Sequence, residues 1–220
     1  RVLFRSIALG RRILVSGIPD SVTPAWGSAV LLAGIDRVGG LSLIACCVAL
    51  LAACTHALLL REVAQRGVPL RIALSTAMLG VVFAASHWLA RPHAVTIACS
   101  AVLIVLLERR DRRAWLAIPL LFALWANLHG GWSFGLILVA CYAVARRTGP
   151  SLALLVAAAL ATFLTPYGPR LHATVLHTLR DPTIARVINE YQPPSLSNPQ
   201  DLLFLVTLAI AAVALLRAVS

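Results

Sequence analysis

The feature that most constrains this chain is a series of apolar runs separated by short polar connections. The runs cover residues 41–60, 72–90, 94–107, 114–128, 132–145, 152–166 and 202–216. A helix needs about 20 apolar residues to cross a hydrocarbon core about 30 Å thick, so these runs predict membrane-spanning helices. With 60% hydrophobic and 12% charged residues, the chain has more apolar side chains than a soluble domain of 220 residues can bury. The sequence therefore predicts an all-α fold, a polytopic transmembrane helical bundle of about seven spans.

The first 40 residues differ from the rest because arginines alternate with their apolar residues. Segments 1–17 and 26–38 each predict an amphipathic helix that lies in the membrane interface. We therefore expect two parts: residues 1–40 as an interfacial segment on the outer face, and residues 41–220 as a transmembrane helical domain. A polar, proline-containing stretch at 167–200 predicts an outer loop within the second part.

The positive charge of the chain has a topological explanation. Ten of the 19 basic residues gather in alternate connections between the runs, and cytoplasmic loops of membrane proteins carry such an excess. They are Arg61, Arg66, Arg71, Arg109, Arg110, Arg112, Arg113, Arg146, Arg147 and Arg217. A net charge of +11 also suits nucleic-acid binding, but this placement favours a multi-pass protein among membrane lipids, and no nucleic-acid partner is expected.

The opposite connections hold most of the unusual polar residues. These form clusters at 87–93, 127–131, 165–172 and 189–194, and five of the six histidines lie on this side, with His56 the exception. Short spans, glycine turns and polar groups gathered on one face predict a cavity that opens outward at the membrane surface.

Two of these clusters contain candidate ligand-binding residues. Arg91 lies at a helix break on the outer side, which indicates a phosphate or carboxylate partner; snorkelling to lipid headgroups is the alternative. Asn127 and His129 precede Gly130 and Gly131, and this glycine pair permits a tight turn with positive φ and lets a ligand approach the backbone. Alternatively, Asn127 caps its helix and His129 faces headgroups.

The acidic residues and the remaining histidines support fewer roles. Glu190 near the outer clusters suits a general base or a group that orients a donor; it is also placed to pair with Arg186, four residues earlier on a helix. No two histidines have the i, i+4 spacing that puts two metal ligands on one helix face. We expect neither a metal nor a cofactor.

Four motifs in this order resemble those of a known group. They are Arg91-Pro92, Trp125-Ala-Asn-Leu-His-Gly-Gly131, Thr165-Pro-Tyr-Gly168 and Glu190-Tyr191. In the group they read R-P, W-x-N-x-H-G-G, N-P-Y-G and E-W, of which W-x-N-x-H-G-G is the most specific. The chain is similar over most of its length to the bacterial C-type multi-pass membrane glycosyltransferases, which depend on polyprenyl-phosphate sugars and are related to protein mannosyltransferases and lipid A aminoarabinose transferases. Residues 1–40 resemble a remnant of the group's first outer loop.

The resemblance implies an inverting transfer from a polyprenyl-phosphate-linked sugar at the outer face of the bacterial cytoplasmic (inner) membrane. In such enzymes an acid in the first outer loop is the base for the acceptor, and Asp20 is the candidate catalytic residue here. Arg91, His129 and Arg170 are expected to contact the lipid phosphate, while Asn127 and Glu190 orient groups. The full substrate-binding set implied is Arg91, His93, Asn127, His129, Tyr167, Arg170 and Glu190.

Some positions depart from the group's pattern. The resemblance implies an aspartate well before the position of Gly10, at Val2 or its neighbours, where this chain has none, and Thr165 and Tyr191 replace asparagine and tryptophan. The first span is also absent. We therefore expect either a chain that is truncated at its N-terminus or a degenerate copy. A non-catalytic transporter or lipid-binding multi-pass protein is the alternative function, although no internal repeat typical of transporters is found.

Overall fold

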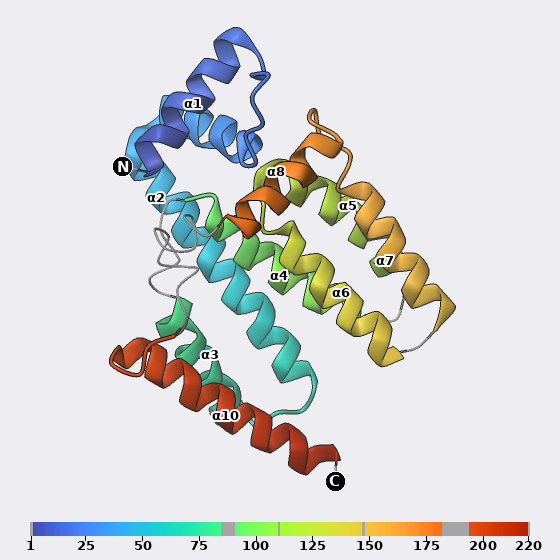
Figure 1. The fold of residues 1–220 in the computed structure, drawn as a ribbon. Helices are drawn as coiled ribbons and strands as arrows, with labels where there is room; N and C mark the ends of the chain where they lie inside the picture. The colour runs from blue at the N-terminus through green and yellow to red at the C-terminus, as the bar shows by residue number, and fades with distance from the viewer. Residues whose placement is uncertain (1, 85–90, 110, 147, 182–193, 220) are drawn as a thin grey trace. The chain divides into compact units, whose positions relative to one another are not determined.

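The computed structural model describes residues 2–84, 91–109, 111–146, 148–181 and 194–219, and within these ranges it is all-helical, as predicted. The chain forms two compact units, Arg1–Val175 and Leu176–Ser220. The first contains α1 (Val2–Ser16), α2 (Trp26–Gln65), α3 (Leu70–Ala84), α4 (His93–Glu108), α5 (Arg112–Leu128), α6 (Trp132–Arg146) and α7 (Gly149–Ala161) (Figure 1). Helix α8 (Pro169–Arg180) begins in the first unit and ends in the second, which also contains α10 (Pro199–Val219).

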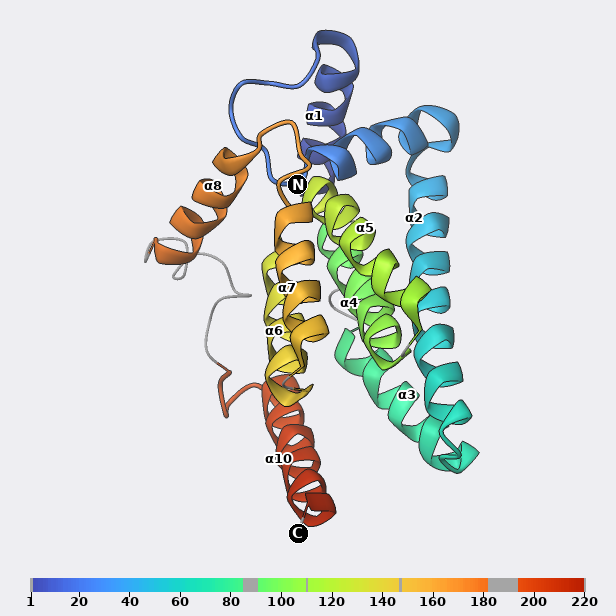
Figure 2. The same cartoon turned by 90° about the vertical axis from the view of Figure 1, so that its right-hand side faces the viewer.

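Each of the seven predicted apolar runs is helical over most or all of its described length. The first run lies within a longer helix. Helix α2 joins the predicted helix at 26–38 to the run at 41–60 through a bend at Gly39 and Gly40 (Figure 2). Gly40 has φ 63° and ψ −160°, a conformation that is essentially restricted to glycine. The bend therefore divides α2 into two arms, at the residue where the predicted interfacial segment ends. The proposed two-part division of the chain itself stays a prediction.

Helix α1 packs against the first arm of α2. A Cβ atom at Gly10 would collide with the carbonyl group of Ala29, so only glycine permits this close approach. Arg11 of α1 also forms an ion pair with Asp36 of α2 at 2.6 Å. The expected amphipathic helix at 1–17 is thus present, and it is packed on the next helix.

The core of the first unit lies among α4, α5, α6 and α7, which run side by side (Figure 1). Phe122 and Trp125 of α5 are fully buried there, and Gly135 of α6 makes room for them, because a Cβ atom at Gly135 would lie 2.5 Å from the Trp125 ring. Small buried residues of α7, among them Ser151 and Ala158, let this helix approach its neighbours closely.

The outward faces of these helices are apolar. On α5, Leu116, Leu120 and Leu124 follow one another at four-residue spacing and are 63%, 73% and 56% exposed. Such an exposed stripe of large aliphatic side chains marks a surface that is covered by lipid or by another protein.

Among the described residues, Trp26–Gln65 is the one helix that is long and apolar enough to cross a membrane, a test that soluble core helices and signal sequences also pass. Only 11% of the most apolar stretch of this helix is buried inside the protein, whereas the core helix of a soluble protein is mostly buried. Helices α4, α5, α6 and α7 have 16, 17, 15 and 13 residues. At 1.5 Å per residue a 16-residue helix is about 24 Å long, which is shorter than the hydrocarbon core. The arrangement of about seven spans therefore stays a prediction.

Candidate functional site

The W-x-N-x-H-G-G motif lies at the turn between α5 and α6. His129 follows α5 with an extended backbone (φ −160°, ψ 145°), and its N–H donates to the Trp125 carbonyl at 2.9 Å. The positive-φ turn that the glycine pair permits is not formed, because neither Gly130 nor Gly131 has a positive φ. Instead, a Cβ atom at Gly131 would collide with the Thr96 hydroxyl of α4 and lie 2.8 Å from its Cγ2. The second glycine is therefore required by the close approach of two helices.

Asn127 connects three segments. Its Nδ2 donates to the carbonyl of Ala123 at 2.7 Å, within α5, and to that of Leu164 at 2.8 Å, after α7. Its Oδ1 accepts from Trp26 Nε1 at 3.1 Å, at the start of α2. Both N–H donors of the amide are therefore used in holding the chain together, as they would be in a structural residue. The predicted role in orienting a ligand stays a prediction.

His129 belongs to a directed chain of hydrogen bonds. Trp125 Nε1 donates to Thr96 Oγ1 at 3.1 Å, and Thr96 Oγ1 lies 2.7 Å from His129 Nδ1. The backbone N–H of Gly131 also donates to His129 Nδ1, at 3.2 Å. The imidazole is thus held by Thr96 of α4 and by the backbone just before α6, and Trp125 of α5 bonds to the same threonine.

His129 lies in the turn, outside both helices, and is neutral at physiological pH. Burial lowers the pKa of its imidazole to about 4, and the charge of His93 lowers it as well. The rings of the two histidines, which come from two different polar clusters of the sequence, are 5.3 Å apart in an edge-to-face arrangement. A neutral imidazole can contact a phosphate only as a hydrogen-bond donor, not as a cation.

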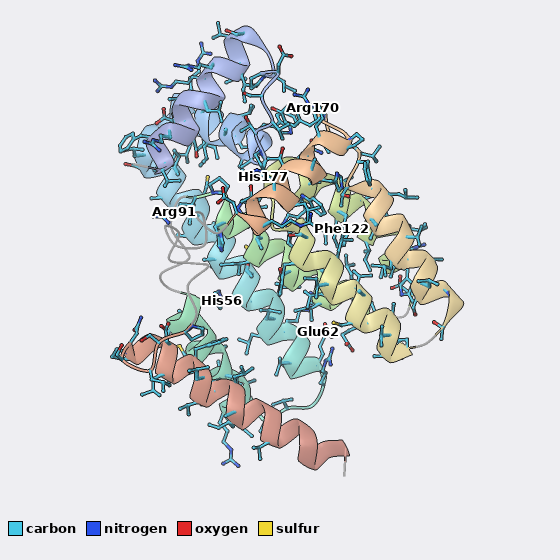
Figure 3. All side chains as sticks on the ribbon, viewed as in Figure 1. His56, Glu62, Arg91, Phe122, Arg170 and His177 are labelled. Atoms are coloured by element: carbon cyan, nitrogen blue, oxygen red, sulfur yellow. The ribbon has the colours of Figure 1, made fainter. Side chains whose placement is uncertain are left out.

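Arg91 is exposed and helps to line an apolar pocket of about 160 Å³ (Figure 3). The pocket lies between the two arms of α2 and the first turn of α4, and Arg91 is its one charged residue among those described. Its apolar lining includes Leu31, Leu32, Ile35, Ile44, Val48 and Val95.

The loop between α1 and α2, which contains Asp20, is tied to the same end of the first unit. Arg170, at the start of α8, donates from Nη2 to the Asp20 carbonyl at 2.6 Å (Figure 3). A Cβ atom at Gly130 would lie 3.8 Å from Pro24 of this loop. The carboxylate of Asp20 is on an exposed residue. Two residues chosen from the resemblance, 150 positions apart, are therefore in contact.

Tyr167 and His172 follow α7. Tyr167 is 6% exposed, and its hydroxyl has no hydrogen-bond partner among the described residues. The His172 ring stacks on Phe163 at 3.9 Å and lies 4.7 Å from the Trp132 ring, with its Nε2 2.7 Å from Thr162 Oγ1. Tyr167 is thus placed as a core residue, and His172 holds α8 against the helices before it.

Glu190 and Arg186 lie outside the described residues. The predicted role of Glu190 and its alternative pairing with Arg186 therefore stay predictions. Sequence reasoning did not select Thr96 or Trp26, although both bond directly to motif residues. Thr96 had one weak signal, its position three residues after His93 at the start of α4. Within the described residues, no group of three or more His, Cys, Asp or Glu side chains is placed to hold a metal ion.

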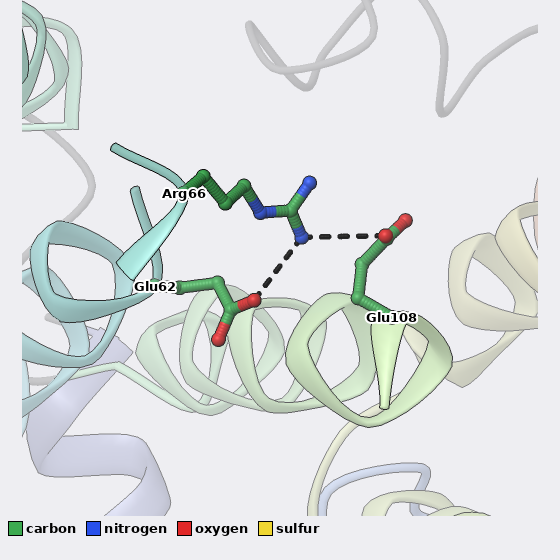
Figure 4. Close-up of polar contacts among 3 residues, drawn as sticks. All are labelled: Glu62, Arg66 and Glu108. Atoms are coloured by element: carbon green, nitrogen blue, oxygen red, sulfur yellow. Dashed lines mark hydrogen bonds and ion pairs between the residues drawn. The ribbon is translucent and has the colours of Figure 1, made fainter. Parts of the chain in front are cut away.

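The opposite ends of α2 and α4 contain an ion-pair cluster. Arg66 Nη2 lies 3.1 Å from Glu62 Oε1 and 3.3 Å from Glu108 Oε2 (Figure 4). Arg66 and Glu108 are well exposed, so this cluster links the two helix ends weakly.

No protein-family model matches the chain, and neither a curated protein nor a solved structure matches it. The similarity to C-type glycosyltransferases therefore depends on the motifs alone.

Proposed function

We propose that this protein is a multi-pass membrane protein that transfers a sugar from a polyprenyl-phosphate carrier to an acceptor at the outer face of the cytoplasmic membrane. The observation that supports this proposal most is that the first turn of α4 contacts both the apolar pocket and the polar α5–α6 turn. Ala94 and Val95 line the apolar pocket, while His93 and Thr96 contact His129 on the polar side. An apolar pocket directly beside a polar turn suits an amphipathic ligand, with a hydrocarbon chain and a polar head.

The membrane location is supported by the exposed apolar surface. The most apolar stretch of α2 is largely unburied, and the leucine stripe of α5 faces outward. Helices of 10–17 residues that cross a bilayer need a locally thinned membrane or interfacial flanks. The arginine-poor connections define the outer ends of the helices. The pocket and the α5–α6 turn lie at these ends.

The proposed chemistry uses the charges at this end. The Asp20 carboxylate accepts the proton of an acceptor hydroxyl as the acceptor oxygen bonds to the anomeric carbon. The bond from that carbon to the phosphate oxygen breaks, and the electron pair leaves with polyprenyl phosphate. Arg91 and Arg170 offset the negative charge that develops on the departing phosphate. Attack opposite the leaving group inverts the anomeric centre.

Binding of radiolabelled undecaprenyl phosphate to the detergent-solubilised full chain tests the first step. We expect Arg91→Ala to weaken binding about 10-fold or more, since a hydrogen bond to a charged group contributes about 1.5–3 kcal/mol. Arg113→Ala, at the opposite end, is the matched control and should bind as the wild type does. Equal binding by wild type and both variants would refute the proposed phosphate contact.

Transfer from undecaprenyl-phosphate sugars into membrane acceptors tests the second step. Asp20→Asn should abolish incorporation while it leaves undecaprenyl phosphate binding intact. Binding by the wild type without any transfer would overturn the enzymatic proposal and favour the lipid-binding alternative.

A further inference from the structure

The direction of every hydrogen bond around His129 is fixed by two groups that can only donate. The indole Nε1–H of Trp125 donates to Thr96 Oγ1, and the backbone N–H of Gly131 donates to His129 Nδ1. Nδ1 therefore presents its lone pair. Since Nδ1 carries no proton, the hydrogen in the 2.7 Å contact between Thr96 and His129 belongs to the threonine hydroxyl.

The other tautomer is disfavoured by the same contacts. A proton on Nδ1 would face the N–H of Gly131 and leave Thr96 Oγ1 to accept from both Trp125 and His129. Gly131 leaves the space that the Thr96 hydroxyl occupies, because a Cβ atom at Gly131 would collide with that oxygen. The neutral imidazole must then carry its proton on Nε2, for which no acceptor is found among the described residues.

We propose that Thr96 is a positioning residue that holds His129 in its Nε2–H tautomer, so that the site offers an oxygen of the bound ligand a fixed, neutral N–H donor. The tautomer follows from the contacts alone, whereas the phosphate or sugar oxygen as the acceptor rests on the proposed function. The neutral Nε2–H donor complements the cationic arginines, because it orients a ligand oxygen through a hydrogen bond without adding positive charge to the site.

The groups that face the imidazole agree with this assignment. Trp125 of α5 and the backbone at the start of α6 do not titrate, and Thr96 and His93 approach from α4. A charge on His93 disfavours a second proton on His129, which keeps the ring neutral.

Nitrogen NMR of the full chain, labelled with ¹⁵N-histidine and reconstituted in lipid nanodiscs, tests the proposal directly. His129 signals are identified by their loss in His129→Asn. At pH 7 we expect a pyridine-type signal for Nδ1 and a pyrrole-type signal for Nε2. A pyrrole-type Nδ1, or a doubly protonated ring at pH 7, would overturn the tautomer assignment without any reference to a ligand.

The role of Thr96 is tested by two substitutions of similar size. Thr96→Val removes the hydroxyl and should give averaged signals from both tautomers, together with a rise in the His129 titration midpoint. Thr96→Ser keeps the hydroxyl and should restore the wild-type spectrum. If Thr96→Val retains the wild-type tautomer and midpoint, Thr96 has no positioning role; if that variant fails to fold, a wild-type-like spectrum for Thr96→Ser is still required.

The ligand part has its own readout. Addition of undecaprenyl phosphate should shift the Nε2–H resonance of His129 in the wild type. No shift at a concentration where Arg91-dependent binding is measured would show that His129 does not contact this ligand, while the tautomer assignment would stand.

Discussion

Acidification should destabilise the first unit through His129. In the folded chain, burial lowers the pKa of this imidazole to about 4, with His93 contributing in the same direction. In the unfolded chain a histidine titrates near 6.5. Between these two values the unfolded state binds a proton that the folded state does not. The free energy of unfolding contributed by this group is therefore unaffected above about pH 6.5 and falls as the pH is lowered toward 4.

The size of the effect follows from the pKa difference. One proton bound only by the unfolded state changes the free energy of unfolding by about 1.4 kcal/mol per pH unit. Over the interval of roughly 2.5 units, the loss approaches 3 kcal/mol. This is a large share of the roughly 5–15 kcal/mol by which folded proteins are stable.

The assay compares the wild type with His129→Asn, whose Oδ1 can take the place of Nδ1 as an acceptor but does not titrate. Denaturant unfolding in mixed micelles is measured from pH 7.5 to 4, and the variant's free energy is subtracted from that of the wild type. The difference should be flat above pH 6.5 and then fall by about 1.4 kcal/mol per unit. Parallel pH profiles for wild type and His129→Asn would refute the reasoning.

Three further predictions concern stability and are measured as shifts in thermal or denaturant unfolding. Gly131→Ala should destabilise by about 1–3 kcal/mol because its Cβ meets Thr96, whereas Gly130→Ala has room for the methyl group and should cost less; equal costs would contradict the packing argument. Gly40→Ala should cost about 1–3 kcal/mol through backbone strain at positive φ, with Gly34→Ala, which has open space, as the control. Asn127→Ala should cost about 1–3 kcal/mol, because it leaves the part-buried indole N–H of Trp26 without its acceptor, and a loss below about 1 kcal/mol would show that water replaces the amide.

The sequence predicted the helices well because apolar runs report burial in a core or in lipid directly. The sequence placed the end of the predicted interfacial segment at residue 40, and α2 bends at this residue. The separate helices predicted at 26–38 and 41–60 correspond to the two arms of α2, because the backbone at Gly39 and Gly40 between them is not helical. The short lengths of α4, α6 and α7 were visible in the sequence, but whether such helices cross a bilayer depends on their surroundings.

The candidate site was predictable only in part, because its contacts join distant segments. Arg170 and Asp20 were selected separately from a resemblance, and nothing in the sequence linked them across 150 positions. Apart from its spacing from His93, nothing in the sequence marks Thr96, since a threonine in an apolar helix usually bonds to the carbonyl one turn earlier, as Thr76 does here. Its bond to His129, 33 positions away, is a product of the tertiary packing of α4 against the turn.

The hydrogen bonds of the W-x-N-x-H-G-G motif show which of its residues are explained by packing alone. Trp125 Nε1 is used by Thr96, both N–H groups of Asn127 are used by backbone carbonyls, and the lone pair of His129 Nδ1 is used by two donors. Gly131 is explained by the space that Thr96 needs. Packing therefore accounts for each of these residues, but not for the choice of an imidazole at position 129, because an asparagine oxygen would serve the same two donors. What the imidazole adds is the N–H on Nε2. If His129→Asn folds with wild-type stability at pH 7 yet binds undecaprenyl phosphate more weakly, that single N–H is what the motif contributes to the ligand; unchanged binding would make the whole motif a packing element.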